Sequence, residues 1–571
     1  MYIKIVRLIR LVASKPYLAK AFLYSIFFDG PRTTFQRVAN KLNGFQQNFR
    51  NYKFALSQPT VPFPPGFLTA FLVSEIKIKN SAFFEIHKYK VNGDGKHAYD
   101  GSVEVVNEPK GKILNELIQS ENSDFVLIAE RSGTSAGLMT KIGCQVAFNK
   151  AKADAFYFDS EIFMKNGNLI PHFRTGFSVE YLLSNDCMGN AIVFNRQALL
   201  DIGGFSSIYD GYTLLTDMFF RFWQSKRKLL NIPEILQREW EEVKLLGKSP
   251  EGQALEVRQK ALDNMKISGT VCKSSREDNV FEVEPALTMK PLVSIVVPFK
   301  DGGNVLERCF TSIFSLTNYP NFEVIAIDNS STESQTFELV ERLQDEPRFR
   351  LLDYKHVFNY SAINNFAVEK AQGEYVILLN SDIEILTADW IQSLLHYATQ
   401  DGIGAVGGLL FYPDMSIEHA GVIIGLGGVA GHSHRGMPSN LNGYFSRPFC
   451  AQEVSAVTAA CLMVRKEIYN EVGGLNEKSL GVLYNDVDFC LRLRLVGYRN
   501  IYNPRCKAIH YESRTRGHDF TPSKFNRRQL EVEFMLDKYN EMISSGDPFY
   551  SPHLCVEREV FELKRGSIYC G

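Results

Sequence analysis

The strongest constraint on the fold of this 571-residue chain is an internal repeat. Residues 191–205 read AIVFNRQALLDIGGF, and residues 461–475 read CLMVRKEIYNEVGGL. Both stretches predict an apolar strand, a short helix and a Gly-Gly turn. Residues 209–222 (YDGYTLLTDMFFRF) and 483–493 (LYNDVDFCLRL) then resemble each other in the same way. Similarity between such distant segments predicts two copies of one fold, each with its own hydrophobic core.

The composition and charge are ordinary for a soluble globular protein. Hydrophobic residues make up 45% of the chain and charged residues 22%. Lys+Arg 63 against Asp+Glu 64 gives a formal net charge of -1, so we expect no nucleic-acid partner. The ten cysteines include no CxxC pair, which favours reduced thiols in a cytoplasmic protein over disulfides or structural zinc.

The patterns along the chain predict five segments. The first is basic and helical; it could lie on the inner face of the cytoplasmic membrane or pack on the protein itself, and no stretch has the apolar length of a membrane span. Two α/β regions follow, separated by a charged, helix-prone linker, and a helical tail ends the chain. The bounds are 1–60 for the lead-in, 61–238 for the first copy, 239–288 for the linker, 289–520 for the second copy and 521–571 for the tail.

In the second copy, predicted strands alternate with predicted helices. An apolar strand at 293–297 is stopped by Pro298, and another strand ends on Asp328. The stretch GEYVILLNSDIE (373–384) begins as a buried strand and then stops at three polar residues, Asn380, Ser381 and Asp382. Alternation of this kind predicts a doubly wound parallel sheet, in which ligands bind outside the carboxyl ends of the strands.

Together these stretches resemble the family-2 glycosyltransferases of the GT-A fold, and most closely the bacterial enzymes of O-antigen and other surface polysaccharides, often described as rhamnosyltransferases. The resemblance covers residues 289–515 strongly and 110–240 weakly. Its landmarks are VSIVVPFKD, EVIAIDNSS, FNYSAINNFAVEKAQGEYVILLNSD, AVTAACLMVRKEIYNEVGGLNE, NDVDFCLRLRLVGYR and HYES.

The resemblance implies an α/β fold with two GT-A-like domains in tandem, flanked by helical segments. It also implies an inverting enzyme that moves a sugar from a nucleotide-sugar donor, dTDP-rhamnose or a UDP-hexose, to a growing lipid-linked surface polysaccharide. Such an enzyme would work in the cytoplasm or at the inner membrane face. Alternatives are a bifunctional enzyme with two active domains and a non-catalytic glycan-binding scaffold.

Individual roles follow from the same resemblance. Asn380-Ser381-Asp382 stands where the family has Asp-x-Asp, with Asn in place of the first Asp. Asp382 is therefore expected to hold a divalent metal, Mn²⁺ or Mg²⁺, together with His510. Asp486 is expected to be the catalytic base, supported by Asn485 and Asp488. The expected donor-binding residues are Pro298, Asp328, Asn365, Asn380, Ser381 and Asp382.

Without the family, plainer interpretations stay open for these residues. Asp328, in Asp-Asn-Ser-Ser, also suits a helix N-cap. His510 could be an ordinary core histidine, and two acids that open a helix are more often caps than catalysts.

A glycine-rich stretch, GLGGVAGHSHRG at 425–436, does not fit the GxxxxGK[ST] pattern of a phosphate-binding loop. We expect a substrate-side or purely conformational loop. His432 and His434 could bind a metal there, but we expect the loop to have no nearby carboxylate partner.

The first copy lacks the residues on which the chemistry of the second depends. We expect it to keep the sheet, to lose metal ligand, base and nucleotide contact, and to help hold the acceptor. The acidic pair in AFYFDSEIF, Asp159 and Glu161, is the one feature that favours a second active site. Alignment places Glu130 at Asn380, Ser132 at Asp382, Asp217 at Asp488, Leu215 at Asp486, and AFFEIHKYK where the strand ending on Asp328 belongs.

Overall fold

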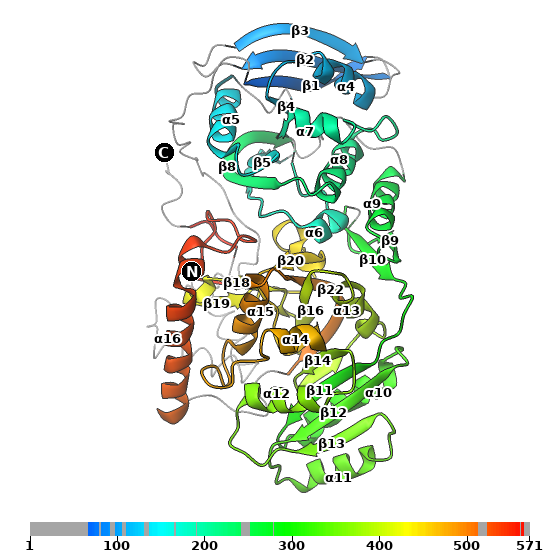
Figure 1. Ribbon diagram of the computed structural model, residues 1–571, viewed down its shortest axis with the longest axis vertical. Coiled ribbons are helices and arrows are strands. Elements are labelled where there is room, and N and C mark those ends of the chain that lie inside the picture. Colours follow the sequence, from blue (N-terminus) through cyan, green and yellow to red (C-terminus); the bar gives the residue numbers. More distant parts are fainter. Residues whose placement is uncertain are drawn as a thin grey trace, which may run out of the picture.

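The computed structural model contains two α/β units stacked along the long axis of the molecule, as Figure 1 shows. The structure describes residues 67–564, with gaps at 79–80, 92–96, 106–109, 131–135, 165–166, 190, 241–251, 278, 512–521 and 560. The basic lead-in predicted for residues 1–60 lies outside the described residues. In the described part of the chain, no helix has both the length and the apolar character of a membrane span.

The first unit contains eight strands and five helices within its described ranges. They are β1 (Leu68–Ile78), β2 (Ser81–Val91), β3 (His97–Val105), α4 (Lys110–Gln119), β4 (Phe125–Glu130), α5 (Ala136–Asn149), β5 (Ala155–Phe163), β6 (Leu169–His172), α6 (Val179–Ser184), β7 (Ala191–Asn195), α7 (Arg196–Asp201), α8 (Tyr212–Gln224) and β8 (Leu229–Trp240). A helix and a hairpin follow, α9 (Gln253–Asn264) with β9 (Gly269–Lys273) and β10 (Phe281–Pro285).

The second unit opens with strictly alternating strands and helices and then becomes more irregular. Its elements are β11 (Val293–Phe299), α10 (Gly303–Leu316), β12 (Phe322–Asp328), α11 (Ser334–Leu343), β13 (Phe349–Asp353), α12 (Tyr360–Lys370), β14 (Tyr375–Leu379), β15 (Ile383–Ile385), α13 (Trp390–Ala398), β16 (Ile403–Phe411), β17 (Ile417–His419), β18 (Val422–Ile424), η1 (Leu426–Gly428), β19 (Ala430–His432), η2 (Tyr444–Phe449), β20 (Gln452–Val454), β21 (Cys461–Arg465), α14 (Lys466–Glu471), α15 (Asn485–Leu495), β22 (Arg499–His510) and α16 (Pro522–Ser545).

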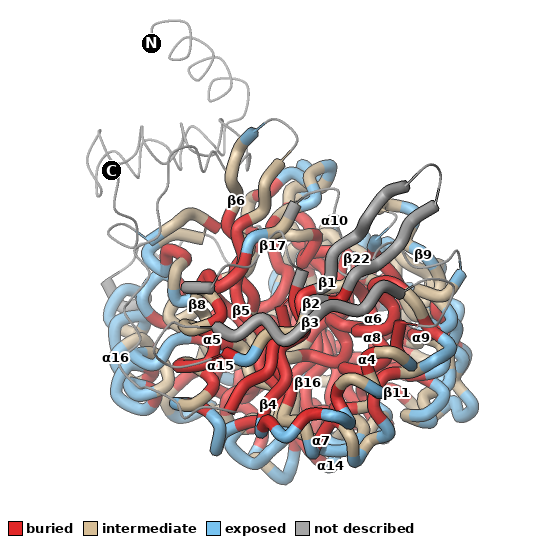
Figure 2. The backbone as a smooth tube through the Cα atoms, turned by 90° about the horizontal axis from the view of Figure 1, so that it is seen from above, coloured by how far each residue is buried: buried red, intermediate tan, exposed pale blue. Residues whose placement is uncertain are grey.

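The main sheet of the second unit has the predicted parallel centre. Its strand order is β13-β12-β11-β14-β21-β16-β22-β15, and β11 to β14 pair in parallel. All five residues of β14 are buried, as a strand covered on both faces requires. Figure 2 shows the buried core running through the strands of both units, with the exposed residues around it.

One predicted strand end was wrong by two residues. Strand β11 does not stop before Pro298 but continues to Phe299, and Pro298 pairs with Ile327 of β12. Strand β14 pairs with β11 only as far as Val296, so the missing amide hydrogen of Pro298 breaks no bond on that side.

The sheet of the first unit repeats only half of this plan. Its order is β3-β2-β1-β4-β7-β5-β6, and β4, β7, β5 and β8 pair with the same directions as β14, β21, β16 and β22. However, β1, β2 and β3 form an antiparallel meander, where β11, β12 and β13 are parallel. AFFEIHKYK does occupy the place of β12, but it runs the other way. The expectation that the first copy simply kept the sheet is therefore corrected.

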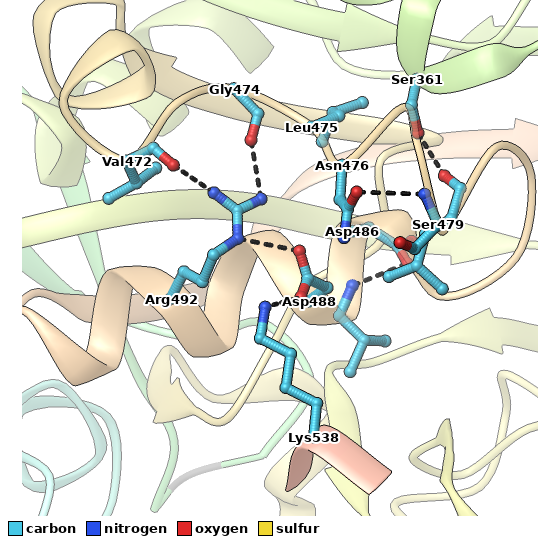
Figure 3. Close-up of polar contacts among 12 residues, drawn as sticks. Ser361, Val472, Gly474, Leu475, Asn476, Ser479, Asp486, Asp488, Arg492 and Lys538 are labelled. Atoms are coloured by element: carbon cyan, nitrogen blue, oxygen red, sulfur yellow. Dashed lines mark hydrogen bonds and ion pairs between the residues drawn. The ribbon is translucent and has the colours of Figure 1, made fainter. Parts of the chain in front are cut away.

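An arginine clamp is common to both units. Arg492 donates to Asp488 on its own helix and to the carbonyls of Val472 and Gly474, which form the Gly-Gly turn (Figure 3). Arg221 makes the same three bonds in the first unit, to Asp217, Ile202 and Gly204. The predicted match of Asp217 to Asp488 is thus present in the folded protein.

The segment predicted as a linker, 239–288, packs on both units. Val257, Ala261 and Leu262 of α9 belong to the core of the first unit. On the other side, Arg276 donates to the carbonyls of Ser439 and Leu441 in the second unit. The described part of the segment contains both a helix, α9, and a hairpin, β9–β10, so it is not wholly helical.

The clamp generates a stability prediction. Arg221→Leu leaves the Asp217 carboxylate buried without its partner, and we expect a loss of about 2–4 kcal/mol of unfolding free energy. The matched control is Arg342→Leu, because the Arg342–Glu307 pair is exposed, with side chains at 60% and 48%. That change should cost about 0.5 kcal/mol or less. Urea unfolding of the full chain checks both; equal losses would contradict the clamp.

Candidate active site

Three strands of the second unit end at one edge of the sheet. The register pairs Phe299 with Asp328, and β14 ends beside them at Leu379. The turn Asn380-Ser381-Asp382 follows at once, so the side chains predicted for the donor site gather where parallel sheets bind their ligands.

Asp382 meets His510 because of strand pairing. After the turn the chain forms β15, which pairs antiparallel with the end of β22, so that Ile383 lies opposite His510. The Asp382 Oδ1 lies 3.2 Å from the Nε2 of His510. Both side chains are buried, at 6% and 7% exposure. His510 is therefore a buried histidine that faces a carboxylate at the ligand edge of the sheet.

Two carboxylates control the pKa of His510. Burial alone would lower the pKa of His510, but the carboxylates of Asp382 and Glu418 raise it to about 10. Both carboxylates thus favour the charged form of the imidazole that lies between them. Mn²⁺ or Mg²⁺ can be held by one or two such side chains when substrate phosphates supply further ligands. Asp382 and His510 fit that pattern.

Asp486 is brought to the same place by the backbone of residues 459–460. The Asn380 amide donates to the carbonyl of Ala460, at 3.1 Å. The next residue back, Ala459, donates its amide to the Oδ2 of Asp486, at 3.0 Å. The Oδ1 of Asp486 accepts from the amide of Val487. The carboxylate is therefore fixed in orientation, one residue pair away from the Asn380-Ser381-Asp382 turn.

The neighbours of Asp486 are structural. Asp488 is fully buried and accepts from Arg492, from Lys538 and from the hydroxyl of Tyr539, so it ties α15 to α16 (Figure 3). Asn485 is also buried and donates to the carbonyl of Val482. These contacts describe supporting residues.

Two of the residues expected to bind the donor form hydrogen bonds with other residues of the protein. Asp328 accepts at Oδ1 from the amide and hydroxyl of Ser331. It caps a turn rather than a helix, because α11 begins only at Ser334. Asn365 accepts from the amide of Leu475 and donates to its carbonyl, and Asn115 does the same with Phe205 in the first unit. A bond kept in both units indicates that Asn365 positions the Gly-Gly turn.

The structure adds a residue that the sequence did not single out. Glu418 of β17 is buried at 2% exposure, and its Oε1 lies 3.0 Å from the Nδ1 of His432. The expectation that His432 has no carboxylate neighbour was therefore wrong. His434 is used differently: it stacks on Phe561 and accepts from the amide of Tyr444.

In the first unit the corresponding place contains an arginine. Strand register puts Arg238 where β22 has Ile509, so Glu239 stands in the place of His510. Glu239 accepts from the guanidinium of Arg174, at 2.6 Å. The backbone amide of Arg174 donates to Asp159, and its guanidinium donates to Ser160. Leu215, buried at 1% exposure, stands where Asp486 would be. Ser132 lies outside the described residues.

A loop from the second unit packs on the residues that flank this arginine. Phe445 stacks on His172 with ring centroids 3.6 Å apart, the hydroxyl of Tyr444 accepts from the amide of Phe173, and Arg447 donates to Thr175. The acidic pair is therefore not an open site. Burial raises the pKa of Asp159 to about 7, and its carboxylate accepts from the backbone amide of Arg174.

Comparisons with known proteins agree on the family of the second unit. Residues 294–473 match the model of the glycosyl transferase family 2. A 408-residue stretch is 32% identical to the O-antigen biosynthesis protein RfbC of Myxococcus xanthus, over 69% of this chain and 31% of that protein. A 274-residue stretch is 45% identical to the uncharacterized protein y4gI of Sinorhizobium fredii, over 48% of this chain and 30% of that protein. The chain thus spans about a third of these two relatives.

A third relative is shorter. The N-acetylglucosaminyl-diphospho-decaprenol L-rhamnosyltransferase of Mycobacterium tuberculosis is 25% identical over 284 residues, which are 44% of this chain and 86% of that protein. The family-model match over residues 294–473 identifies this part of the second α/β unit as a family-2 glycosyltransferase domain.

Proposed function

We propose that the chain is an inverting glycosyltransferase that moves one sugar from a nucleotide-sugar donor to a growing surface glycan. One observation carries the proposal. The backbone pair Ala459–Ala460 bonds the Asn380-Ser381-Asp382 turn on one side and Asp486 on the other. We propose that the donor diphosphate binds at this turn and that Asp486 is the base beside it.

Asp486 takes the proton in this mechanism. The acceptor hydroxyl oxygen attacks the anomeric carbon, its proton passes to Asp486, and the bond from that carbon to the diphosphate oxygen breaks. The amide of Ala459 keeps the Asp486 carboxylate pointed in one direction, so the base is oriented before the acceptor arrives. Attack from the side opposite the leaving group inverts the anomeric configuration.

Asp382 and His510 would hold Mn²⁺ or Mg²⁺. Such an ion, when bound, neutralises the negative charge that develops on the leaving nucleoside diphosphate. Asn380 lies beside the same imidazole, its side-chain nitrogen 3.4 Å from the Nε2 of His510, and is placed to contact the ribose or a water on the ion. Pro298, Asp328 and Ser381 line the strand ends where the nucleotide would lie.

The relatives favour a class of donor and acceptor. One is named for O-antigen biosynthesis and another for rhamnose transfer to a diphospho-decaprenol carrier. We therefore propose dTDP-rhamnose, with UDP-hexoses as the alternative, and a lipid-linked glycan at the inner face of the cytoplasmic membrane. The grouping of Asp382, His510 and Asp486 near one edge of the sheet favours an enzyme over the glycan-binding scaffold.

The base assignment predicts the effect of Asp486→Asn. An amide cannot accept the acceptor's proton, so transfer should fall by about 10²–10⁴-fold. Donor binding should stay the same, because the amide preserves the shape of the side chain. Sugar transfer from a panel of dTDP- and UDP-sugars, with calorimetry for the donor, measures both. Asp345→Asn, in an exposed turn, is the control. Turnover near wild type would remove Asp486 from this role.

The metal assignment predicts a shared effect of two substitutions. Asp382→Ala and His510→Ala should each weaken Mn²⁺ binding by roughly tenfold or more, since losing even an outer-shell partner costs that much. EDTA should abolish transfer by the wild-type chain, and Mn²⁺ should restore it. Asp345→Ala should change neither quantity. Normal turnover in EDTA would show that side-chain cations neutralise the diphosphate instead.

We infer further that the first unit binds no donor. Its nucleotide half is an antiparallel meander, and the place of His510 and the metal is filled by Glu239 and Arg174. A guanidinium paired with a carboxylate leaves no negative site for Mn²⁺. The loop of Tyr444 and Phe445 seats this unit against the second, which supports a role in holding the acceptor side.

Donor stoichiometry tests that inference on the full chain. Calorimetry with Mn²⁺ and the active nucleotide-sugar should give one site per chain, and Asp382→Ala should remove it. Asp159→Asn should leave both the stoichiometry and the turnover unchanged, because this residue lies in the first unit. A second metal-dependent site that survives in Asp382→Ala would make the protein bifunctional.

A further inference from the structure

Glu418 is a buried carboxylate that the proposed mechanism does not use. It lies on β17 in the sequence SIEHAGVIIG, and both of its neighbours, Ile417 and His419, are also buried. Pairing between β16 and β17 shifts at this point, because Phe411 pairs with Ile417 and Leu410 pairs with His419. Glu418 is the extra residue of the bulge, and bulges often re-aim one side chain.

The re-aimed carboxylate lies between two histidines from other elements. Its Oε1 is 3.0 Å from the Nδ1 of His432, and its Oε2 is 3.7 Å from the Nδ1 of His510. On the far side of the second imidazole, the Nε2 of His510 faces Asp382 at 3.2 Å. A chain of alternating carboxylates and imidazoles therefore runs from β19 through Glu418 to the turn after β14.

Two atoms in this series of four side chains have no hydrogen bond. Oε2 of Glu418 and Nδ1 of His510 are both buried and lack a hydrogen-bond partner, although they face each other at 3.7 Å. Buried polar atoms left unpaired are rare and costly. In enzymes without ligands, catalytic hydrogen bonds are often long and tighten when the ligand arrives.

Glu418 stands behind His510, not beside Asp382. Among the described residues no group of three His, Cys, Asp or Glu side chains is arranged to hold an ion together, so Glu418 adds no third ligand. It faces the ring nitrogen that points away from Asp382. A carboxylate in that position fixes the orientation of a metal-binding imidazole and makes its other nitrogen a better ligand.

The first unit provides an internal comparison. There β5 and β6 pair without a bulge: Ser160 pairs with His172 and Glu161 with Pro171. No residue is inserted between the two pairs, and no counterpart of Glu418 exists. The unit in which an arginine fills the metal position thus also lacks the orienting carboxylate.

We propose that Glu418 is a positioning residue for the metal site of the second unit: it holds the His510 imidazole with Nε2 directed toward Asp382, while His432 anchors the other oxygen of the carboxylate. This inference rests on the proposed metal role of Asp382 and His510 and extends it by one residue.

Binding of Mn²⁺ alone to the full chain tests the proposal without measuring activity. Titration of Mn²⁺ followed by electron paramagnetic resonance should give a Kd about 10–100-fold higher for Glu418→Ala than for wild type. Glu418→Gln keeps the volume and one acceptor oxygen, so it should lose less. This second variant retains the test if Glu418→Ala does not fold.

A matched control comes from the opposite edge of the sheet. Glu323 is buried at 8% exposure and accepts from Ser294 and Arg350, near the start of β12. Glu323→Gln should leave the Mn²⁺ Kd within about twofold of wild type, whatever it does to stability.

The outcomes separate this inference from the proposed function. If wild type binds Mn²⁺ and Asp382→Ala does not, the metal site stands. Wild-type affinity in both Glu418 variants would then overturn the positioning role alone. If Asp382→Ala binds Mn²⁺ as well as wild type does, the proposed metal site itself fails, and the positioning role fails with it.

Discussion

The pairing of β15 with the end of β22 sets the geometry of the site. These strands are far apart in the sequence, and their register places Ile383 opposite His510. A shift of one residue would turn the imidazole to the other face of the sheet. Asp382 would then stay at the strand end without its histidine, and Glu418 would face an apolar side chain. The meeting of His510 with Asp382 and Glu418 therefore follows from this strand pairing.

Much of this arrangement could be predicted from sequence because it depends on strand ends. Asp328 and Asp382 follow uninterrupted apolar runs, and a parallel sheet brings such ends to one edge. The match of Asp217 to Asp488 was predicted from the repeat, but the bonds from Arg492 and Arg221 to the Gly-Gly turns were not. Glu418 could not be found this way, because a bulge redirects it and bulges leave no periodic signal. The sequence does contain a weak signal of another kind, a Glu-His pair inside an otherwise apolar stretch.

The antiparallel direction of β1, β2 and β3 shows a different limit of prediction from sequence. An apolar strand has the same alternation in either direction, so AFFEIHKYK suited the place of β12 without revealing its orientation. The length of the connection between β1 and β2 does indicate the direction of β2. Only two residues separate β1 from β2, and a connection that short can join antiparallel strands alone, whereas parallel strands need a crossover of a dozen or more residues. Connection length, rather than the loss of single charges, was the stronger sign that this copy differs.

The two units meet the same electrostatic requirement in different ways. Carboxylates buried at the end of a sheet need a positive partner, because an unpaired charge there is costly. In the first unit the positive partner is the side chain of Arg174, which donates to Glu239. Phe445 of the second unit stacks on His172, two residues before it. In the second unit His510 stands between Asp382 and Glu418, and both carboxylates raise its pKa. A fixed cation makes a rigid docking surface. A place that an ion can enter and leave suits an enzyme that must release a diphosphate after each transfer, which is why we assign the chemistry to the second unit and the support to the first.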